Sequence, residues 1–127
     1  MNYQGSCHCG AVTFEVTAPG HLEVEDCNCS ICSKSGFLHL IVPKSKFRLL
    51  SGRDKLETYT FNTGLARHTF CRICGIKPFY VPRSNLDGID VNVRCLDTLP
   101  ESVSVVKFDG KNWELNAHTI AHKSEEA

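Results

Sequence analysis

The sequence predicts an all-β fold, a small and mostly antiparallel β domain with short connecting turns. Apolar and polar residues alternate over stretches of strand length, and turn-forming residues recur about every ten positions. No segment keeps a sustained helical period. Because 127 residues suffice for one hydrophobic core, we expect a single domain over residues 1–127 without a linker.

The expected strands follow one another along the chain. Alternation over residues 12–16 and 89–93 predicts half-buried strands, and residues 56–61 alternate less cleanly. Four further runs are apolar or β-branched and have the length of a strand: 37–42, 47–50, 79–81 and 103–108. Turn signals such as Asp87-Gly88 separate the strands.

Little regular structure is expected elsewhere. Residues 97–102 contain Pro100 and are expected to hold one helical turn. The tail over residues 115–127 is expected to be peripheral, with fraying over residues 123–127.

Charge and hydropathy exclude several classes of partner. Lys plus Arg and Asp plus Glu each number 14, so no basic field is available for a nucleic-acid backbone, and direct nucleic-acid binding is not expected. No apolar stretch reaches the roughly 20 residues of a membrane-spanning helix. Without a recognisable secretory signal the expected location is cytoplasmic, or nuclear if the chain is eukaryotic. The sequence contains no pattern that predicts the oligomeric state.

Cysteine is the compositional outlier, with eight residues in the chain. In a reducing compartment, clustered cysteines more often bind metal than form disulfides. Bridging cysteines separated by a single residue would also be strained. Seven of the eight fall into three groups: Cys7 and Cys9; Cys27, Cys29 and Cys32; Cys71 and Cys74.

The first and third groups each look like half of a closed metal site. Cys71 and Cys74 precede Gly75, and Cys7 and Cys9 precede a glycine in the same way. Such a turn places two sulfurs on one cation, and the glycine accepts a backbone angle that other residues resist. Together the two turns supply four thiolates, the ligand set of structural zinc, which contributes directly to folding free energy.

The second group has three cysteines, which favours an open site. Three protein ligands with a fourth position left to water or substrate are typical of catalytic zinc, and a purely thiolate set selects this ion. A thiol is the natural fourth ligand. A closed structural site remains an alternative, and an iron–sulfur cluster fits the spacing less well. The residues that could close the site are Cys95, His8, His39 and His68.

Other metal candidates are weaker. Cys95 ends a predicted strand, where a small buried hydrophobic role is expected. His118 and His122 have a spacing that can hold a metal on a helix, but no glutamate follows the first histidine, and no metal role is expected.

The three cysteine motifs resemble those of the glutathione-dependent formaldehyde-activating family, which includes S-(hydroxymethyl)glutathione synthase and centromere protein V. The resemblance covers roughly residues 5–114 and rests on these segments: 5–12, 27–32, 67–75, 91–97 and 108–114. It implies a zinc-stapled "β-tent" fold with two Zn²⁺ per chain. By this likeness the structural zinc is held by Cys7, Cys9, Cys71 and Cys74, and the zinc of the active site by Cys27, Cys29 and Cys32.

The resemblance also implies an activity, that of a carbon–sulfur lyase. Glutathione, a small thiol, would combine with formaldehyde to give S-hydroxymethylglutathione, or the adduct would be cleaved. The site would act by holding two partners together, or mainly in the cleavage direction. Candidates for the acid that protonates oxygen are His8, His39 and His68. The alternative is a non-enzymatic zinc-binding module for protein or chromatin interaction.

Metal loading would change the charge of the chain. Seven thiolates carry −7 and two divalent ions +4, so the neutral chain would stand near −3 before any ligand binds.

Overall fold

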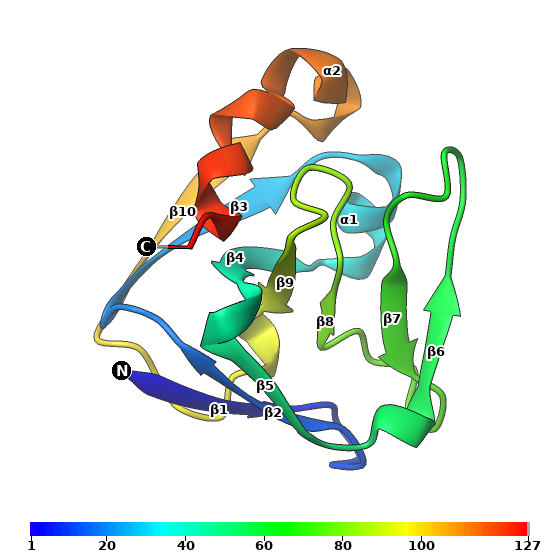
Figure 1. Ribbon diagram of the computed structural model, residues 1–127, viewed down its shortest axis with the longest axis vertical. Coiled ribbons are helices and arrows are strands. Elements are labelled where there is room, and N and C mark those ends of the chain that lie inside the picture. The colour runs from blue at the N-terminus through cyan, green and yellow to red at the C-terminus, as the bar shows by residue number, and fades with distance from the viewer. Residues whose placement is uncertain (127) are drawn as a thin grey trace.

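The computed structural model describes residues 1–126 and consists mainly of strands in three sheets (Figure 1). The first sheet has the order β1 (Asn2–Ser6), β2 (Thr13–Thr17) and β5 (Phe47–Ser51). The second has the order β10 (Ser102–Phe108), β3 (His21–Cys27), β4 (Leu38–Pro43), β9 (Gly88–Asn92) and β8 (Phe79–Tyr80). The third pairs β6 (Leu56–Tyr59) with β7 (His68–Cys71). All pairs of these strands are antiparallel except β3 with β10, so the predicted all-β fold is confirmed.

Helical structure is short. The two α-helices are α1 (Ser30–Ser35) and α2 (Trp113–Asn116). Single 3-10 turns are found at Lys44–Lys46, Arg53–Lys55, Val93–Cys95, Gly110–Asn112, Ala117–Thr119 and Ala121–Ser124. No helix among residues 1–126 is long and apolar enough to cross a membrane.

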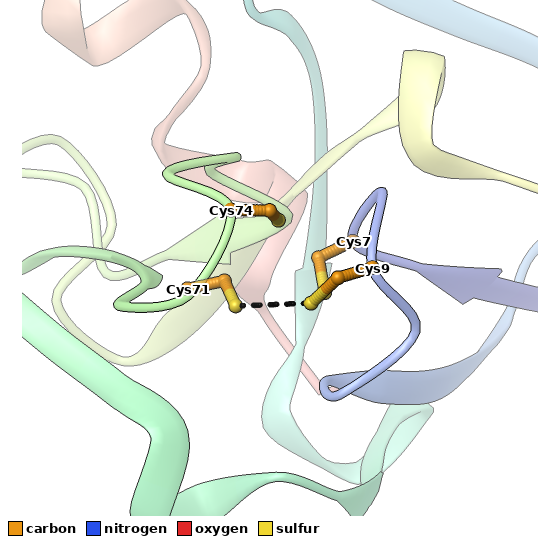
Figure 2. A group of neighbouring side chains, drawn as sticks. All are labelled: Cys7, Cys9, Cys71 and Cys74. Atoms are coloured by element: carbon orange, nitrogen blue, oxygen red, sulfur yellow. Dashed lines mark hydrogen bonds between the residues drawn. The ribbon is translucent and has the colours of Figure 1, made fainter.

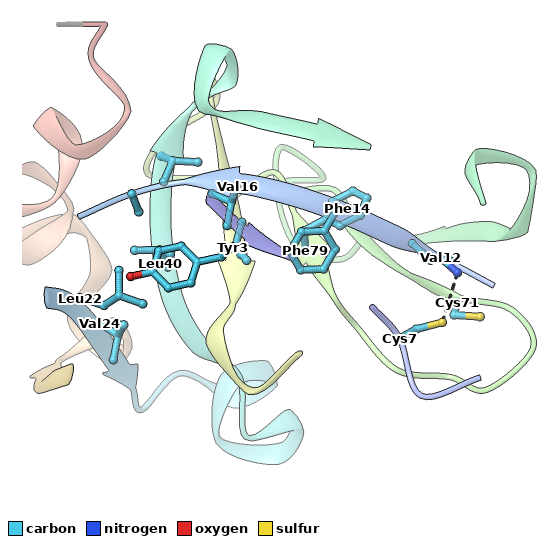
Figure 3. Packing of buried hydrophobic residues seen from close by; sticks show 13 residues of the cluster. Tyr3, Cys7, Val12, Phe14, Val16, Leu22, Val24, Leu40, Cys71 and Phe79 are labelled. Carbon is cyan, nitrogen blue, oxygen red and sulfur yellow. Dashed lines mark hydrogen bonds between the residues drawn. The ribbon is translucent and has the colours of Figure 1, made fainter. Parts of the chain in front are cut away.

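The core lies between the first two sheets (Figure 3). Tyr3, Phe14 and Val16 come from β1 and β2 and are fully buried. They face apolar residues of the five-stranded sheet: Leu22, Val24, Leu40, Val42 and Val91. Phe79 packs edge-on against Phe14, with ring centroids 5.9 Å apart. Burying this apolar area is the main source of folding free energy apart from any metal.

The opposite face of the five-stranded sheet is polar. Residues in register on neighbouring strands point to the same side of a sheet. Glu25 pairs with His39, and Asp90 pairs with both Ile41 and Tyr80. These side chains therefore share one face, although Glu25, His39 and Asp90 are buried. The alternation that builds the core also gathers ionisable groups behind it.

Three strands and both α-helices were not predicted: β1, β3, β7, α1 and α2. Strand β3 presents only Leu22 and Val24 to the core. Two apolar residues are too few for the sequence pattern alone to predict a strand here. The helical turn predicted over residues 97–102 is wrong. A 3-10 turn lies earlier, at Val93–Cys95, where the Asn92 side chain accepts a hydrogen bond from Arg94 N at 3.1 Å.

The fraying predicted for the tail is wrong at Lys123 and Ser124. Buried Asn85 donates from Nδ2 to Ile120 O, Ala121 O and Ser124 Oγ at 3.0, 3.1 and 3.0 Å. Lys123 also binds Glu25. These contacts dock the tail on the polar face of the five-stranded sheet, where it becomes part of a pocket wall. Ala127 lies outside the described residues.

Candidate metal centres and pocket

Two turns bring four of the predicted ligands together (Figure 2). Cys7 and Cys9 lie in the turn between β1 and β2. Cys71 is the last residue of β7, and Cys74 lies in the turn that follows. Each turn is closed by a glycine N–H that donates to the first cysteine's carbonyl oxygen: Gly10 to Cys7 at 3.2 Å and Gly75 to Cys71 at 2.8 Å. Both glycines have φ of +79°, which side chains rarely tolerate.

The sulfur spacing of this first cluster fits a tetrahedral ion. Cys7 Sγ lies 3.6 Å from Cys9 Sγ, which lies 3.7 Å from Cys71 Sγ. A tetrahedron with Zn–S bonds of about 2.3 Å has edges of about 3.8 Å. Val12 N also donates to Cys7 Sγ at 3.4 Å, which holds this sulfur in the turn. The cluster could therefore hold a metal ion that ties β1–β2 to β7, two segments far apart in sequence.

The second cluster forms where β3 meets α1. Cys27 ends β3, Cys29 precedes the first residue of α1, and Cys32 lies in the first turn of the helix. Their sulfurs lie within 4.8 Å of one another. Hydrogen bonds from Cys27 and Cys32, together with N–H groups at the start of α1, lower the pKa of Cys29 to about 2. The same sulfur contacts, together with burial, raise the pKa of Cys32. Crowded thiols that resist joint ionisation are suited to a cation.

A glycine allows the loop after β10 to approach this cluster. A Cβ atom on Gly110 would lie 2.3 Å from Cys27 Sγ and 3.1 Å from Cys29 Cβ. The loop is fixed through Asn28, whose Nδ2 donates to Asp109 Oδ1 and whose Oδ1 accepts from Lys111 N, both at 3.0 Å. The C-terminal third of the chain thus packs directly against the sulfurs.

A pocket of about 310 Å³ opens at the second cluster. All three of its cysteines line the pocket, whereas those of the first cluster are not among the lining residues. The polar face of the five-stranded sheet contributes Glu25, His39, Tyr80 and Asp90, and the tail contributes Trp113 and Ile120. Only the second cluster therefore lies beside a space for a small molecule.

His39 has the most defined surroundings of the three histidine candidates. Its Nδ1 lies 2.5 Å from Asp90 Oδ2, and both side chains are buried. Its Nε2 is buried without a hydrogen-bond partner. Burial pushes the pKa of His39 down, but the charge and hydrogen bond of Asp90 push it up, and the pKa is raised overall. The pair can therefore hold a proton at Nε2 in the pocket.

The other two candidates are less suited to proton donation. His68 lines the same pocket, but burial and the charge of Lys77 lower its pKa to about 4, so it is neutral near pH 7. Lys77 Nζ lies 2.7 Å from His68 Nδ1. His8 is exposed in the turn between Cys7 and Cys9, and it is not among the residues lining the pocket.

Cys95 belongs to neither cluster, although the charges of Cys7 and Cys74 in the first cluster act on it. It packs half-buried against the core, and burial raises the pKa of its thiol to about 11. Asp90, Glu25 and Arg83 were missed by sequence reasoning, because no motif marks them. Strand register alone could have placed Asp90 near His39.

Fold and site together define a small β protein with two cysteine clusters that could hold metal ions, one of them beside a pocket. Comparison with known proteins identifies the family. The sequence profile described as "Glutathione-dependent formaldehyde-activating enzyme" matches residues 2–109, and the chain belongs to this family.

Two relatives illustrate the similarity. A Halomonas elongata protein named "Putative glutathione-dependent formaldehyde-activating enzyme" is 51% identical over 35 residues. That match spans 28% of this chain and only 22% of the relative's length. A crystal structure of a Rhodobacter sphaeroides protein shares 34% sequence identity with a TM-score of 0.70, covering 82% of this chain and 100% of the other.

Proposed function

We propose that this chain is an enzyme that forms or cleaves the carbon–sulfur bond between a small thiol and an aldehyde, with glutathione and formaldehyde as the expected pair. The family assignment supports the reaction class. The observation that carries the proposal is the position of Cys27, Cys29 and Cys32, which line a pocket instead of closing over one another.

The two groups of neighbouring cysteines support a proposed assignment of ligands. Cys7, Cys9, Cys71 and Cys74 would hold a structural Zn²⁺, and the pocket trio would hold the Zn²⁺ of the active site. A divalent ion bound by three thiolates would lower the pKa of an incoming thiol and bind it as thiolate.

The chain's own residues would bind the two reactants and would protonate the oxygen of the aldehyde. In the forming direction, thiolate sulfur attacks the aldehyde carbon, and His39 Nε2 gives its proton to the oxygen, which becomes a hydroxyl group. In the cleaving direction, His39 takes the hydroxyl proton while the carbon–sulfur bond breaks, and aldehyde and thiolate leave. Asp90 would fix the tautomer and orientation of His39, and the pocket would hold the two reactants together.

Zinc X-ray absorption of the metal-loaded protein, with and without glutathione, tests the proposal. We expect seven protein sulfur ligands in total, an average of 3.5 per ion, and an average of 4 when the thiol adds its sulfur. Cys95→Ser is the matched control, because this cysteine belongs to neither cluster. A spectrum that glutathione leaves unchanged would indicate a saturated second site and would favour a non-enzymatic binding module.

A further inference from the structure

Strand β10 forms an open edge of the five-stranded sheet (Figure 1). It pairs with β3 over seven residues in an unbroken register, and among residues 1–126 no strand pairs with its other side. Val103, Val105 and Val106 are 41%, 53% and 45% exposed. The opposite edge of the same sheet is β8, which has only two residues, both buried. Natural proteins shorten, charge or cover a sheet edge, because its free N–H and C=O groups can pair with another chain. The long apolar edge at β10 therefore indicates a partner strand.

The backbone groups that a partner would meet belong to alternate residues of β10. Phe108 O accepts from Asn28 N at 3.2 Å, and Ser102 N donates to Gly20 O at 3.4 Å, so both ends of the strand bond towards β3. In a parallel ladder, residues that bond to one neighbour alternate with residues whose groups point the other way. The even-numbered residues of β10 therefore bond to β3. The outward N–H and C=O groups belong to Val103, Val105 and Lys107.

The two outward valines lie on the core side of the sheet. Val103 is in register with Leu22, and Val105 is in register with Val24. Leu22 and Val24 are buried core residues, and residues in register share a face. The apolar face of the sheet thus continues onto β10, where it is open to solvent.

Charged residues of opposite sign flank the valines on this face. Glu101 lies two positions before the first valine, and a Cβ atom on Gly20 would lie 2.6 Å from its Oε2. Lys107 lies two positions after the second valine, and its side chain is 87% exposed. Its carboxylate neighbour Asp26, 2.8 Å away, is itself 42% exposed, so that pair is weak. Lys107 can therefore meet a second carboxylate.

We propose that β10 is a dimerisation strand, and that a second copy of this chain pairs its own β10 antiparallel to the first about a two-fold axis at Ser104. Val103 then lies opposite Val105 of the second copy, and both residues direct their backbone groups towards the partner. Glu101 lies opposite Lys107, and the symmetry repeats each contact. This inference goes beyond the proposed function and does not depend on it.

The charges select this axis among the possible ones. Pairing about Val105 would place Lys107 opposite a valine, and pairing about Val103 would do the same to Glu101. Only the axis at Ser104 sets valine opposite valine and carboxylate opposite ammonium, and opposite charges across a strand pair stabilise it. One strand per protomer is a small interface, so we expect a dimer that dissociates on dilution.

Sedimentation of the metal-loaded chain over a wide range of concentrations tests the proposal. We expect the average mass to rise from that of one chain towards that of two as the concentration increases. The mass of one chain at every concentration would overturn the proposal.

A charge exchange tests the register. Glu101→Lys and Lys107→Glu each place like charges opposite one another twice, so we expect each to raise the dimer Kd about tenfold or more. The double variant restores both pairs with reversed sign and should return close to the wild-type Kd. Glu57→Lys and Lys46→Glu are the controls, because they change exposed residues away from β10 in the same way and should leave Kd unchanged. Failure of the double variant to recover would contradict the register.

A cysteine at the axis provides an independent measurement. The Ser104 backbone bonds to β3, so the two copies of this residue would form a non-hydrogen-bonded pair with Cα atoms about 4.5 Å apart. This separation suits a disulfide, and mild oxidation of the metal-loaded Ser104→Cys variant should give a covalent dimer. Val106→Cys is the matched control, because position 106 is exposed on the same face but lies opposite position 102. Cross-linking of the control as readily as of Ser104→Cys, or of neither, would exclude this axis.

Discussion

At the scale of single residues, His39 and Asp90 determine when the pocket can donate a proton. The raised pKa of His39 means that its protonated form persists to higher pH than that of a free histidine. An activity that needs this acid should hold at low pH and fall as pH rises through the pKa. In Asp90→Asn the upward influence is removed while burial still lowers the pKa. The falling limb of the pH–rate profile should therefore move to lower pH.

Removal of the acid itself, in His39→Gln, should reduce the activity. General acid catalysis contributes typically 10²- to 10⁴-fold, so we expect kcat to fall within that range while zinc content stays unchanged. His8→Gln is the control, because His8 is exposed and is not among the residues lining the pocket. Equal activity of the two variants would remove His39 from the reaction.

Gly110 is a second residue with a defined role, because it sets how closely the β10 loop approaches the cysteines. In Gly110→Ala the new Cβ would meet Cys27 Sγ at 2.3 Å, so the sulfur or the loop must move. We expect zinc per chain to fall from two towards one, with a loss of about 1–3 kcal/mol in unfolding free energy, as for other overpacked sites. Elemental analysis and denaturant unfolding measure both quantities.

Gly64→Ala provides the comparison for that variant. A Cβ at Gly64 meets no atom within 4 Å, but φ is +70°. The substitution should cost about 1 kcal/mol through backbone strain and leave zinc content unchanged. If Gly110→Ala also keeps both ions, the close approach of the loop has no bearing on the second cluster.

At the scale of elements, sequence patterns predicted most of the strands and the members of both cysteine clusters. Alternation of apolar and polar residues over five positions predicted strands such as β2 and β9. It missed β3, whose second half turns Glu25 and Cys27 towards the pocket. Spacing of cysteines identified both groups that could hold a metal ion, because the members of one turn are close in sequence. The His39–Asp90 pair joins positions 51 residues apart through strand register, which no local pattern records.

The first cluster joins the β1–β2 turn to β7, so its loss should destabilise both parts of the fold. Cys71→Ser removes a ligand that ties the β1–β2 turn to β7. We expect faster hydrogen exchange in β1, β2, β6 and β7, and a loss of about 2–5 kcal/mol in unfolding free energy, comparable to removing a native disulfide. In Cys27→Ser the change should be confined to α1 and the 108–112 loop. Equal unfolding of both variants would show that the second cluster is structural too.

At the scale of the whole molecule, the two clusters differ in how solvent reaches them. The second opens into a pocket, whereas the first has four cysteines at the edge of the core, of which Cys9 is exposed. An ion with an open coordination position exchanges ligands without unfolding of the chain. An ion enclosed by four protein thiolates is released when the surrounding turns separate. Under the proposed function, the first cluster would supply stability and the second would supply reactivity.

Metal removal by a chelator should therefore occur in two phases. The first should release one zinc per chain and change the fluorescence of Trp113, the single tryptophan, because this residue lines the pocket beside the second cluster. Far-UV circular dichroism should change only in the second phase, when the remaining ion leaves and the β1–β2 and β7 turns separate. Cys27→Ser should show the second phase alone. Release of both ions in one phase, together with the loss of circular dichroism, would mean that the two clusters stabilise the fold as a unit.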